Sequence, residues 1–195
     1  MINEIVLATS NKGKIREFAG LLEGVFGRII SLNDLESPPD VAEDGMTFSE
    51  NAIKKARAIA AYSGLPALAD DSGLAVDALG GRPGVYSARY AGEGATDRDN
   101  IRKLLTELRG AEDRKARFVC VLALVTPDGK ETVAEGSCEG IIIDEPRGKG
   151  GFGYDPVFFL PEYGKTMAEI SPELKNKISH RARASEALIK LLKEG

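Results

Sequence analysis

Two neighbouring carboxylates are the residues best suited to chemistry in this chain. Asp70 and Asp71 follow an apolar run and lead directly into Ser72-Gly73. Because successive side chains of a strand point to opposite faces, only one of the two acids can face a given pocket. A carboxylate at the end of a buried strand, beside a glycine turn, can bind a metal ion or accept a proton from water. The alternative is an Asp-Ser-Gly turn whose acids only accept hydrogen bonds from the backbone.

A second acidic pair, Glu43-Asp44, lies in the proline- and acid-rich segment 36–45. Loop acids are commonly solvated, and this remains one interpretation. They are also the best partners in the sequence for a metal site at Asp70-Asp71, because Mg²⁺ is held by few carboxylates together with phosphate oxygens. A helix is expected to follow at once, since Thr47 and Glu50 have the spacing of a capping box.

The segment Thr9–Lys14, read TSNKGK, is a candidate phosphate-binding loop. The apolar run 2–8 before it predicts a buried strand, and the apolar spacing from Ile15 to Leu22 predicts a helix after it. A helix that begins in such a loop presents backbone N–H groups and the positive end of its dipole, which suit an anion. The spacing of a Walker A loop is absent. The alternative is an ordinary N-capped surface helix with solvated lysines.

A glycine-rich segment near residue 150 carries two aromatic rings. Gly148, Gly150 and Gly153 match G-x-G-x-x-G, but a dinucleotide fingerprint must open a helix. Here the segment leads through Asp155-Pro156 into the strand-like Val157-Phe158-Phe159, which argues against a Rossmann fold. A flexible loop ending in two rings could instead clamp a planar base, with stacking worth roughly 1–3 kcal/mol per base. The alternative is that Phe152 and Tyr154 pack into the core.

The C-terminal segment predicts one helix with basic residues. Ser171 and Pro172 are a favourable capping residue and first helical residue. Lys175, His180 and Arg181 lie mostly off its apolar side, where basic residues are normally solvated. Lys175 and His180 are separated by roughly 140° around an ideal helix, so they could reach one ligand only if the helix begins late or bends, or if long side chains wrap round it.

The elements that position these residues predict a mixed sheet flanked by helices. Strands are expected at 28–32, at 74–79, at 117–125 and from about 131, and the last two form a hairpin. Helices are expected from Phe48 to about Tyr62 and after the capping sequence Thr96–Asp99. This intermixing is typical of an α/β fold. No linker separates two halves, so we expect a single domain over residues 1–195.

The composition of the chain narrows its class. Of its 195 residues, 43% are hydrophobic and 29% charged, which argues against disorder. A net charge of −4 argues against broad binding to nucleic acid. No apolar run approaches the roughly 20 residues needed to span a membrane, and the N-terminal residues lack the pattern of a signal peptide. With two cysteines in apparent strands and a single histidine, we expect reduced thiols, no multi-histidine metal site and a cytoplasmic location.

Together these features suggest a nucleoside phosphate ligand and metal-assisted attack of water on phosphorus. They also carry a resemblance. Five separated motifs, in order, resemble the inosine triphosphate pyrophosphatase family, most closely its bacterial branch of dITP/XTP pyrophosphatases. The motifs are Thr9–Lys14, Ala69–Leu74, Gly80–Tyr90, Phe152–Pro156 and Ser179–Arg181.

The resemblance implies an elongated two-lobed α/β fold around a long mixed β-sheet, and a homodimer. It implies Mg²⁺-dependent hydrolysis of noncanonical purine triphosphates (ITP, dITP and XTP) to the monophosphate and pyrophosphate, which removes them from the nucleotide pool. Two other functions remain open at this point. One is a related pyrophosphatase acting on modified pyrimidines, and the other is a nucleotide sensor without catalysis, against which the two adjacent acids argue.

The same resemblance assigns roles to matching positions. Asp71 is expected to bind metal and to accept the proton of the attacking water, with Glu43, or alternatively Asp44, as the second metal ligand. Lys175 and Arg181 would donate to the oxygen at purine position 6, and Phe152 would stack on the base. The full set expected to bind substrate is Thr9, Ser10, Asn11, Lys12, Gly13, Lys14, Ser72, Phe152, Gly153, Tyr154, Asp155, Lys175, His180 and Arg181.

Overall fold

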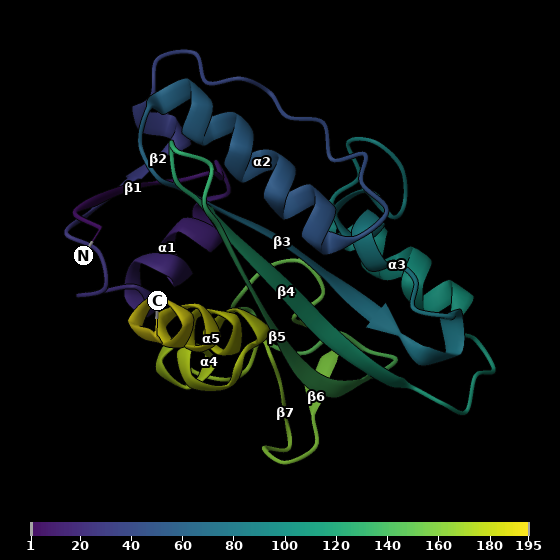
Figure 1. Ribbon diagram of the computed structural model, residues 1–195. Helices are drawn as coiled ribbons and strands as arrows, with labels where there is room; N and C mark the ends of the chain where they lie inside the picture. Colours follow the sequence, from purple (N-terminus) through teal and green to yellow (C-terminus); the bar gives the residue numbers. More distant parts are fainter. Residues whose placement is uncertain (1, 195) are drawn as a thin grey trace. The chain divides into compact units, whose positions relative to one another are not determined.

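The computed structural model describes residues 2–194 and contains a seven-stranded mixed sheet (Figure 1). The strand order is β2-β1-β3-β4-β5-β6-β7. Strands β1 and β2 pair in parallel, as do β1 and β3, whereas β5, β6 and β7 pair antiparallel. The prediction of a mixed sheet flanked by helices is therefore confirmed. The strands are β1 (Glu4–Leu7), β2 (Arg28–Ser31), β3 (Ala67–Val76), β4 (Lys115–Val125), β5 (Glu131–Ile142), β6 (Phe158–Leu160) and β7 (Lys165–Thr166).

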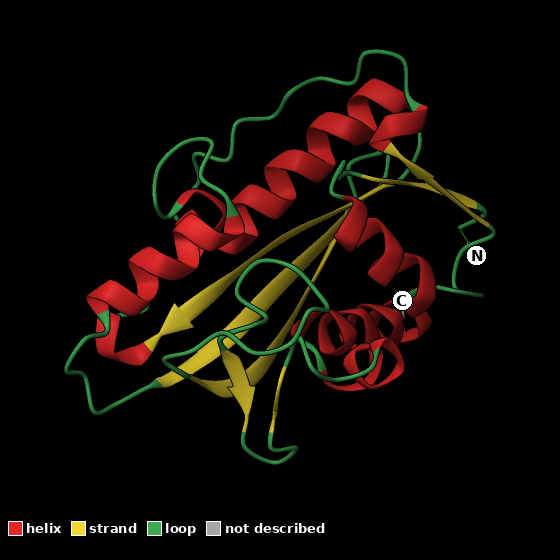
Figure 2. Cartoon of the chain, turned by 180° about the vertical axis from the view of Figure 1, so that it is seen from behind, coloured by secondary structure: helices red, strands yellow, loops and turns green. Residues whose placement is uncertain are grey.

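Five α-helices accompany the sheet in the described part of the chain (Figure 2). Both capping boxes predicted from the sequence are present, with Thr47 before α2 and Thr96 before α3. Each threonine accepts a hydrogen bond from the third helical residue, whose acid in turn accepts from the threonine N–H. The helices are α1 (Lys12–Leu21), α2 (Phe48–Ser63), α3 (Asp97–Glu107), α4 (Pro172–Ile178) and α5 (His180–Glu194).

The chain divides into two compact units. Unit 1 comprises Met1–Asp71, Cys120–Gly136 and Arg181–Gly195, and unit 2 comprises Ser72–Val119 and Ser137–His180. None of the described helices is long and apolar enough to cross a membrane.

Unit 1 has a hydrophobic layer on each face of its strands. One layer joins Leu7 and Leu68 to Phe18 of α1 and Leu188 of α5. The other joins alternate strand residues, such as Ala69, to α2. Figure 1 shows α2 on one side of these strands and α1 with α5 on the other. Even-numbered residues of β3 in this unit therefore face α1 and α5, and odd-numbered ones face α2, which places Asp70 and Asp71 on opposite faces as predicted.

Unit 2 has a core of its own. Leu104 and Leu108 of α3 pack with Leu74, Phe118 and Phe158 from the strands. All five side chains are buried, and the ring centroids of Phe118 and Phe158 are 4.4 Å apart. The hairpin prediction is confirmed beside this core, because β4 and β5 are neighbours joined by a turn in which Gly129 donates to the Thr126 carbonyl.

The expected turn at Ser72-Gly73, with a separate strand at 74–79, is wrong. Residues 67–76 form one uninterrupted strand, and 77–79 are a short 3₁₀ helix. Gly73 keeps an extended backbone, and nine of the ten residues of β3 are buried, so the chain gains more by continuing in the sheet than by turning. Asp71 consequently lies within a strand rather than at its end.

The single C-terminal helix is also wrong. Ser179 has an extended backbone (ψ 160°) and is buried, so α4 ends at Ile178 and α5 begins at His180. The expectation that the basic residues here would be solvated fails as well. Lys175, His180 and Arg181 are all buried, because acidic or aromatic side chains meet each of them.

Candidate active site

Asp71 is a buried carboxylate held by an amide. Its residue is 5% exposed, and its Oδ2 accepts a hydrogen bond of 2.9 Å from Nδ2 of Asn51 in α2. Burial raises the pKa of Asp71 to about 6, and the negative charge of Glu43 adds to this, although Lys55 and the Asn51 bond oppose it. A carboxylate with such a pKa accepts a proton from water more readily than an ordinary aspartate.

Asp70 lies in a cationic environment. Its Oδ2 is 2.8 Å from Nζ of Lys14 in α1 and 3.9 Å from Nε of Arg181 in α5. Burial alone would raise the pKa of Asp70, but Lys14, Arg181 and Lys55 outweigh it and hold the pKa well below its usual range. Asp70 is thus a permanent anion that neutralises buried cations, whereas its neighbour Asp71 can exchange a proton near neutral pH. Such a separation of two carboxylates marks different roles for them.

The acidic loop, residues 43–47, is held against the first turns of α2. Lys55 Nζ contacts Glu43 Oε1 at 2.5 Å, whereas the more exposed Lys54 contacts Asp44 Oδ1 at 2.5 Å. The Asp44 side chain is 71% exposed, and that of Glu43 is 33% exposed. Both views show the chain running along α2 before it enters the helix (Figures 1 and 2). The loop therefore turns Glu43, rather than Asp44, inward.

Lys55 links the acidic loop to the strand that carries the two aspartates. Besides Glu43, its ammonium group contacts the backbone oxygen of Asp70 at 2.6 Å. Burial alone would lower the pKa of Lys55, but the negative charges of Asp70, Glu43 and Asp71 raise it. This part of the site is therefore strongly negative and already attracts a cation.

The donor set beside Lys55 suits a hard divalent ion. Glu43 and Asp71 offer carboxylate oxygens and Asp70 a backbone oxygen, which are ligands that Mg²⁺ accepts. Two carboxylates are few, and no group of three or more His, Cys, Asp or Glu side chains arranged for a metal is found in residues 2–194. An ion bound here would complete its shell with water and substrate oxygens, as Mg²⁺ usually does.

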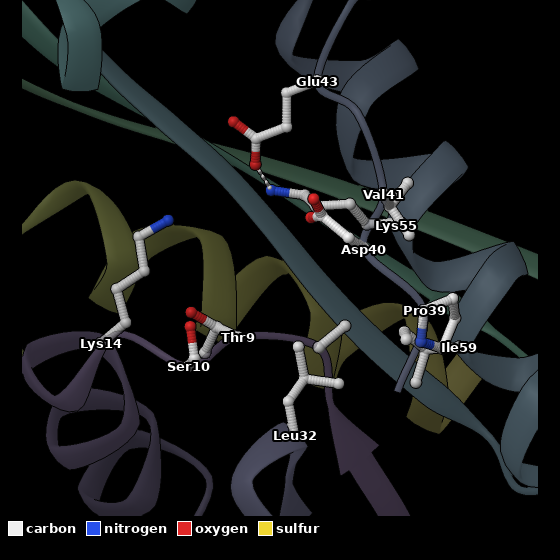
Figure 3. A pocket seen from close by; sticks show the side chains of 11 residues that line it. Thr9, Ser10, Lys14, Leu32, Pro39, Asp40, Val41, Glu43, Lys55 and Ile59 are labelled. Carbon is white, nitrogen blue, oxygen red and sulfur yellow. Dashed lines mark hydrogen bonds and ion pairs between the residues drawn. The ribbon is translucent and has the colours of Figure 1, made fainter. Parts of the chain in front are cut away.

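The predicted phosphate loop opens onto a cavity of about 190 Å³. Figure 3 shows the hydroxyl groups of Thr9 and Ser10 and the ammonium group of Lys14 at this cavity, with the Glu43–Lys55 pair across from them. All five residues belong to unit 1. The structure thus brings the loop and Glu43 to one cavity, as the sequence analysis expected of a triphosphate and metal site.

The helix terminus in this loop is partly satisfied by its own cap. Asn11 Oδ1 accepts from the N–H groups of Gly13 (2.8 Å) and Lys14 (3.1 Å), and the Asn11 N–H donates to Thr9 Oγ1 at 3.2 Å. Asn11 therefore fixes the loop backbone, as in the capped-helix interpretation. Lys12 is exposed at the start of α1.

In unit 2, Lys175 and the glycine-rich loop form a second group of expected site residues. Lys175 is 6% exposed, and its Nζ lies 2.6 Å from Asp155 Oδ2 and 5.0 Å from the centre of the Phe152 ring. The Phe152 N–H donates to the same Asp155 oxygen at 3.0 Å, and the Gly153 N–H donates to Asp97 at 2.7 Å. These contacts fix a half-buried aromatic ring beside a buried cation.

The two rings of that loop have different surroundings. Tyr154 lies in the core, and its hydroxyl donates to the Ser87 carbonyl at 2.9 Å, so Phe152 is the ring left near the surface. His180 stacks on Phe118 with a centroid distance of 4.8 Å. Ser72 is half-buried and directly follows Asp71 in β3. Arg181 belongs to unit 1 and contacts Glu17 at 3.0 Å, whereas Lys175, its expected partner at the base, belongs to unit 2.

Asn51 and Lys55 were missed by sequence reasoning. Their spacing of four residues places them on one face of α2, and both precede a predicted acidic strand. That signal was available, but an apolar face of Phe48, Ala52 and Ala56 dominated the interpretation of this helix. The partners of Asn51 and Lys55 lie outside the helix, which is why its own sequence does not reveal them.

The fold and this site have close counterparts among known proteins. Residues 5–191 match the model of the Ham1 family, and the chain belongs to that family. It is 58% identical over 185 residues to the dITP/XTP pyrophosphatase of Geobacillus kaustophilus, covering 94% of this chain and 91% of that protein. It is 52% identical over 198 residues to the dITP/XTP pyrophosphatase of Shigella flexneri, covering all of both chains.

Solved structures agree with this assignment. A HAM1 protein from Coxiella burnetii superposes with a TM-score of 0.89 at 48% identity, over 100% of both chains. The Ham1 protein of Staphylococcus aureus gives a TM-score of 0.88 at 46% identity, over 98% of this chain and 99% of that one.

Proposed function

We propose that this chain is a nucleoside triphosphate pyrophosphohydrolase that converts noncanonical purine triphosphates (dITP, ITP and XTP) into the monophosphate and pyrophosphate. The names of its relatives, at 52–58% identity over nearly the whole chain, support the reaction. The observation in this chain that carries the proposal is Asp71, a buried carboxylate with a pKa near 6 beside a cavity-lining acid and two lysines.

In this reaction Asp71 accepts the proton of the attacking water. The water oxygen forms a new bond to phosphorus, the bridging P–O bond between the α and β positions breaks, and pyrophosphate leaves. Lys14 and the hydroxyl groups of Thr9 and Ser10 bind phosphate oxygens in the cavity. Positive charge aimed at the phosphates stabilises the charge that develops as the bond breaks.

Glu43 and Asp71 would hold the Mg²⁺ ion that the reaction requires. Glu43 is favoured over Asp44 because it lines the cavity and is turned toward Lys55. When bound, the ion neutralises phosphate charge and lowers the pKa of a coordinated water. Lys55 keeps the two carboxylates from repelling each other in the absence of the ion.

Unit 2 residues recognise the base. Phe152 offers a ring for stacking, and the Lys175 ammonium group can donate to the carbonyl oxygen at purine position 6. Adenine carries an amino group there, which would leave the buried lysine without a partner at a cost of roughly 1–3 kcal/mol. The Asp155 carboxylate orients Lys175 and binds the backbone of Phe152.

A pyrophosphate-release assay over ITP, dITP, XTP, GTP and ATP, with Mg²⁺ or with a chelator, tests the proposal. We expect turnover of the first three substrates in the presence of Mg²⁺, and little turnover of ATP. An absence of turnover on every triphosphate would refute the enzyme assignment. Turnover unaffected by the chelator would refute the metal assignment alone.

We also propose that the enzyme acts in the cytoplasm as a homodimer. Both statements rest on the family and on a chain whose described helices cannot span a membrane. Light scattering of the purified protein measures its mass directly, and a mass near 21 kDa, that of one chain, would refute the dimer.

A further inference from the structure

Asn51 is a fully buried amide whose two ends contact different segments. Its Nδ2 donates to Asp71 Oδ2 at 2.9 Å, and its Oδ1 accepts from the backbone N–H of Gly45 at 2.8 Å. The residue is 1% exposed. A buried amide that keeps both contacts is held in one orientation, because turning it over would place a donor against a donor and an acceptor against an acceptor.

The loop side of this connection is continuous. Directly after Gly45, the N–H groups of Met46 and Thr47 donate to Glu50 Oε2 at 2.7 and 3.2 Å. Two residues before Gly45, Glu43 meets Lys55. The backbone from 43 to 47 is thus tied to consecutive turns of α2, and only the Asn51 tie also reaches β3.

Gly45 is fitted to this contact. A Cβ atom at residue 45 would lie 2.7 Å from Asn51 Oδ1 and 2.9 Å from the Glu50 Cβ, which is closer than real Cβ contacts. The backbone of the loop therefore approaches the amide more closely than any side chain allows. This close approach fixes where the loop, and with it Glu43, lies against α2.

We propose that Asn51 is a positioning residue that joins the acidic loop to the Asp71 carboxylate, so that Glu43 and Asp71 keep one mutual geometry. With Asp71 Oδ2 held, the orientation of its other oxygen is fixed toward water or metal. The inference rests on the proposed function for its effect on turnover. Its structural content, a loop held through one amide, is independent of the reaction.

A matched control exists in unit 2. Asn100 is also the fourth residue of a capped helix, is 3% exposed, and uses its amide to accept from the Ala91 N–H and to donate to the Ala88 carbonyl. None of these partners belongs to the proposed catalytic group. The substitutions Asn51→Ala and Asn100→Ala therefore remove the same atoms from equivalent positions, and both should lower the melting temperature.

The decisive variants are Asn51→Ala and Asn51→Asp, compared with Asn100→Ala. We expect kcat on ITP to fall about 10- to 100-fold in both Asn51 variants, with a smaller change in KM, because a misplaced catalytic group costs rate. Asn100→Ala should keep kcat within about twofold, since it leaves the proposed machinery untouched. A full-activity Asn51→Asp variant would overturn the proposal, because aspartate cannot donate to Asp71.

Hydrogen exchange at the Gly45 amide gives a readout that needs no catalysis. Exchange should be about tenfold faster in Asn51→Ala and close to wild type in Asn51→Asp, whose carboxylate can still accept from Gly45. Unchanged exchange in Asn51→Ala would overturn the inference. If the wild type hydrolysed no triphosphate, the proposed function would fail, whereas the exchange result would still decide whether Asn51 holds the loop.

A double substitution separates positioning from general damage. In an Asp71→Asn background, Asn51→Ala should reduce the residual kcat by less than about twofold, because its effect acts through Asp71. An equal loss in both backgrounds would show that Asn51 acts by another route and would overturn the proposal.

Discussion

Helices α2 and α3 begin in the same way and serve different ends. Each follows a capping threonine, carries an acid at its third position and a buried asparagine at its fourth. In each, the asparagine oxygen accepts a backbone N–H from the preceding loop, Gly45 for Asn51 and Ala91 for Asn100. The cap and the loop attachment are therefore shared between the two units.

The difference lies in what the amide nitrogen meets. Asn100 donates to the Ala88 carbonyl, which is a backbone group that neither titrates nor reacts. Asn51 donates to the carboxylate of Asp71. One local motif thus makes a structural tie in unit 2 and part of a candidate active site in unit 1, and the acceptor supplied by the fold decides which.

The largest expected effect removes the charge of that acceptor. Asp71→Asn should lower kcat by about 10³-fold or more while the fold is kept, because the shape is preserved and the proton acceptor is lost. Steady-state kinetics with circular dichroism measure both. Asp70→Asn is the comparison, and if it proved more damaging to kcat than Asp71→Asn, the roles assigned to the two faces of β3 would be reversed.

The next effect contrasts two neighbouring lysines of α2. Lys55→Met should lower kcat about 10- to 100-fold, because it removes the cation between Glu43 and the Asp70 backbone oxygen. Lys54→Met should leave kcat within about twofold, since the exposed Lys54–Asp44 pair contributes little. Equal losses in the two variants would contradict the inward assignment of Glu43.

A titratable acceptor also predicts a pH dependence of stability that is confined to α2. The pKa of Asp71 is raised from 3.8 to about 6 on folding, so its contribution to stability is present below about pH 4 and is lost as the pH rises through 6. Asp71→Asn should therefore be more stable than wild type at pH 7.5 by about 1–2 kcal/mol, and this advantage should vanish near pH 4. Urea denaturation of metal-free protein at the two pH values measures it.

Asn100→Ala gives the counterpart, because its lost acceptor is a backbone carbonyl. Its destabilisation should be the same at pH 4 and pH 7.5, apart from effects common to the whole protein. A stability difference between Asp71→Asn and wild type that did not change between these pH values would contradict the raised pKa.

The smallest expected effect concerns the shared part of the two motifs. Thr47→Ala and Thr96→Ala should each cost about 1 kcal/mol of unfolding free energy, because each loses one N-cap hydrogen bond. Thermal denaturation checks both. Since only the first cap adjoins the acidic loop, a detectable fall in kcat is expected for Thr47→Ala alone, and a fall of equal size in both would blur the distinction between the helices.

How far the sequence could predict this molecule depended on the range of each interaction. Both capping boxes involve residues three apart, and the spacing alone identified them correctly. The opposite faces of Asp70 and Asp71 followed from the alternation of a strand. The strand itself was misjudged at Ser72-Gly73, because a glycine signals a turn locally whereas burial on both sides keeps β3 extended.

The missing part of the site depends on distant partners. Asn51 meets Asp71 twenty positions along the chain, and Arg181 meets Glu17 across 164. Nothing in the sequence around Arg181 indicates a buried ion pair, so its solvated placement was a reasonable but wrong expectation. The break at Ser179 is similar, because a serine within a favourable helical pattern gives little local signal.

The attachment of the acidic loop to α2 has a consequence for folding. Its contacts join residues separated by 12 positions or fewer, so closing them costs little chain entropy and does not require the sheet. In pulse-labelling experiments during refolding, the Met46 and Thr47 amides should gain protection before the amides of β3. Half of the metal-binding pair would then be in place before the strand bearing Asp71 is laid into the sheet.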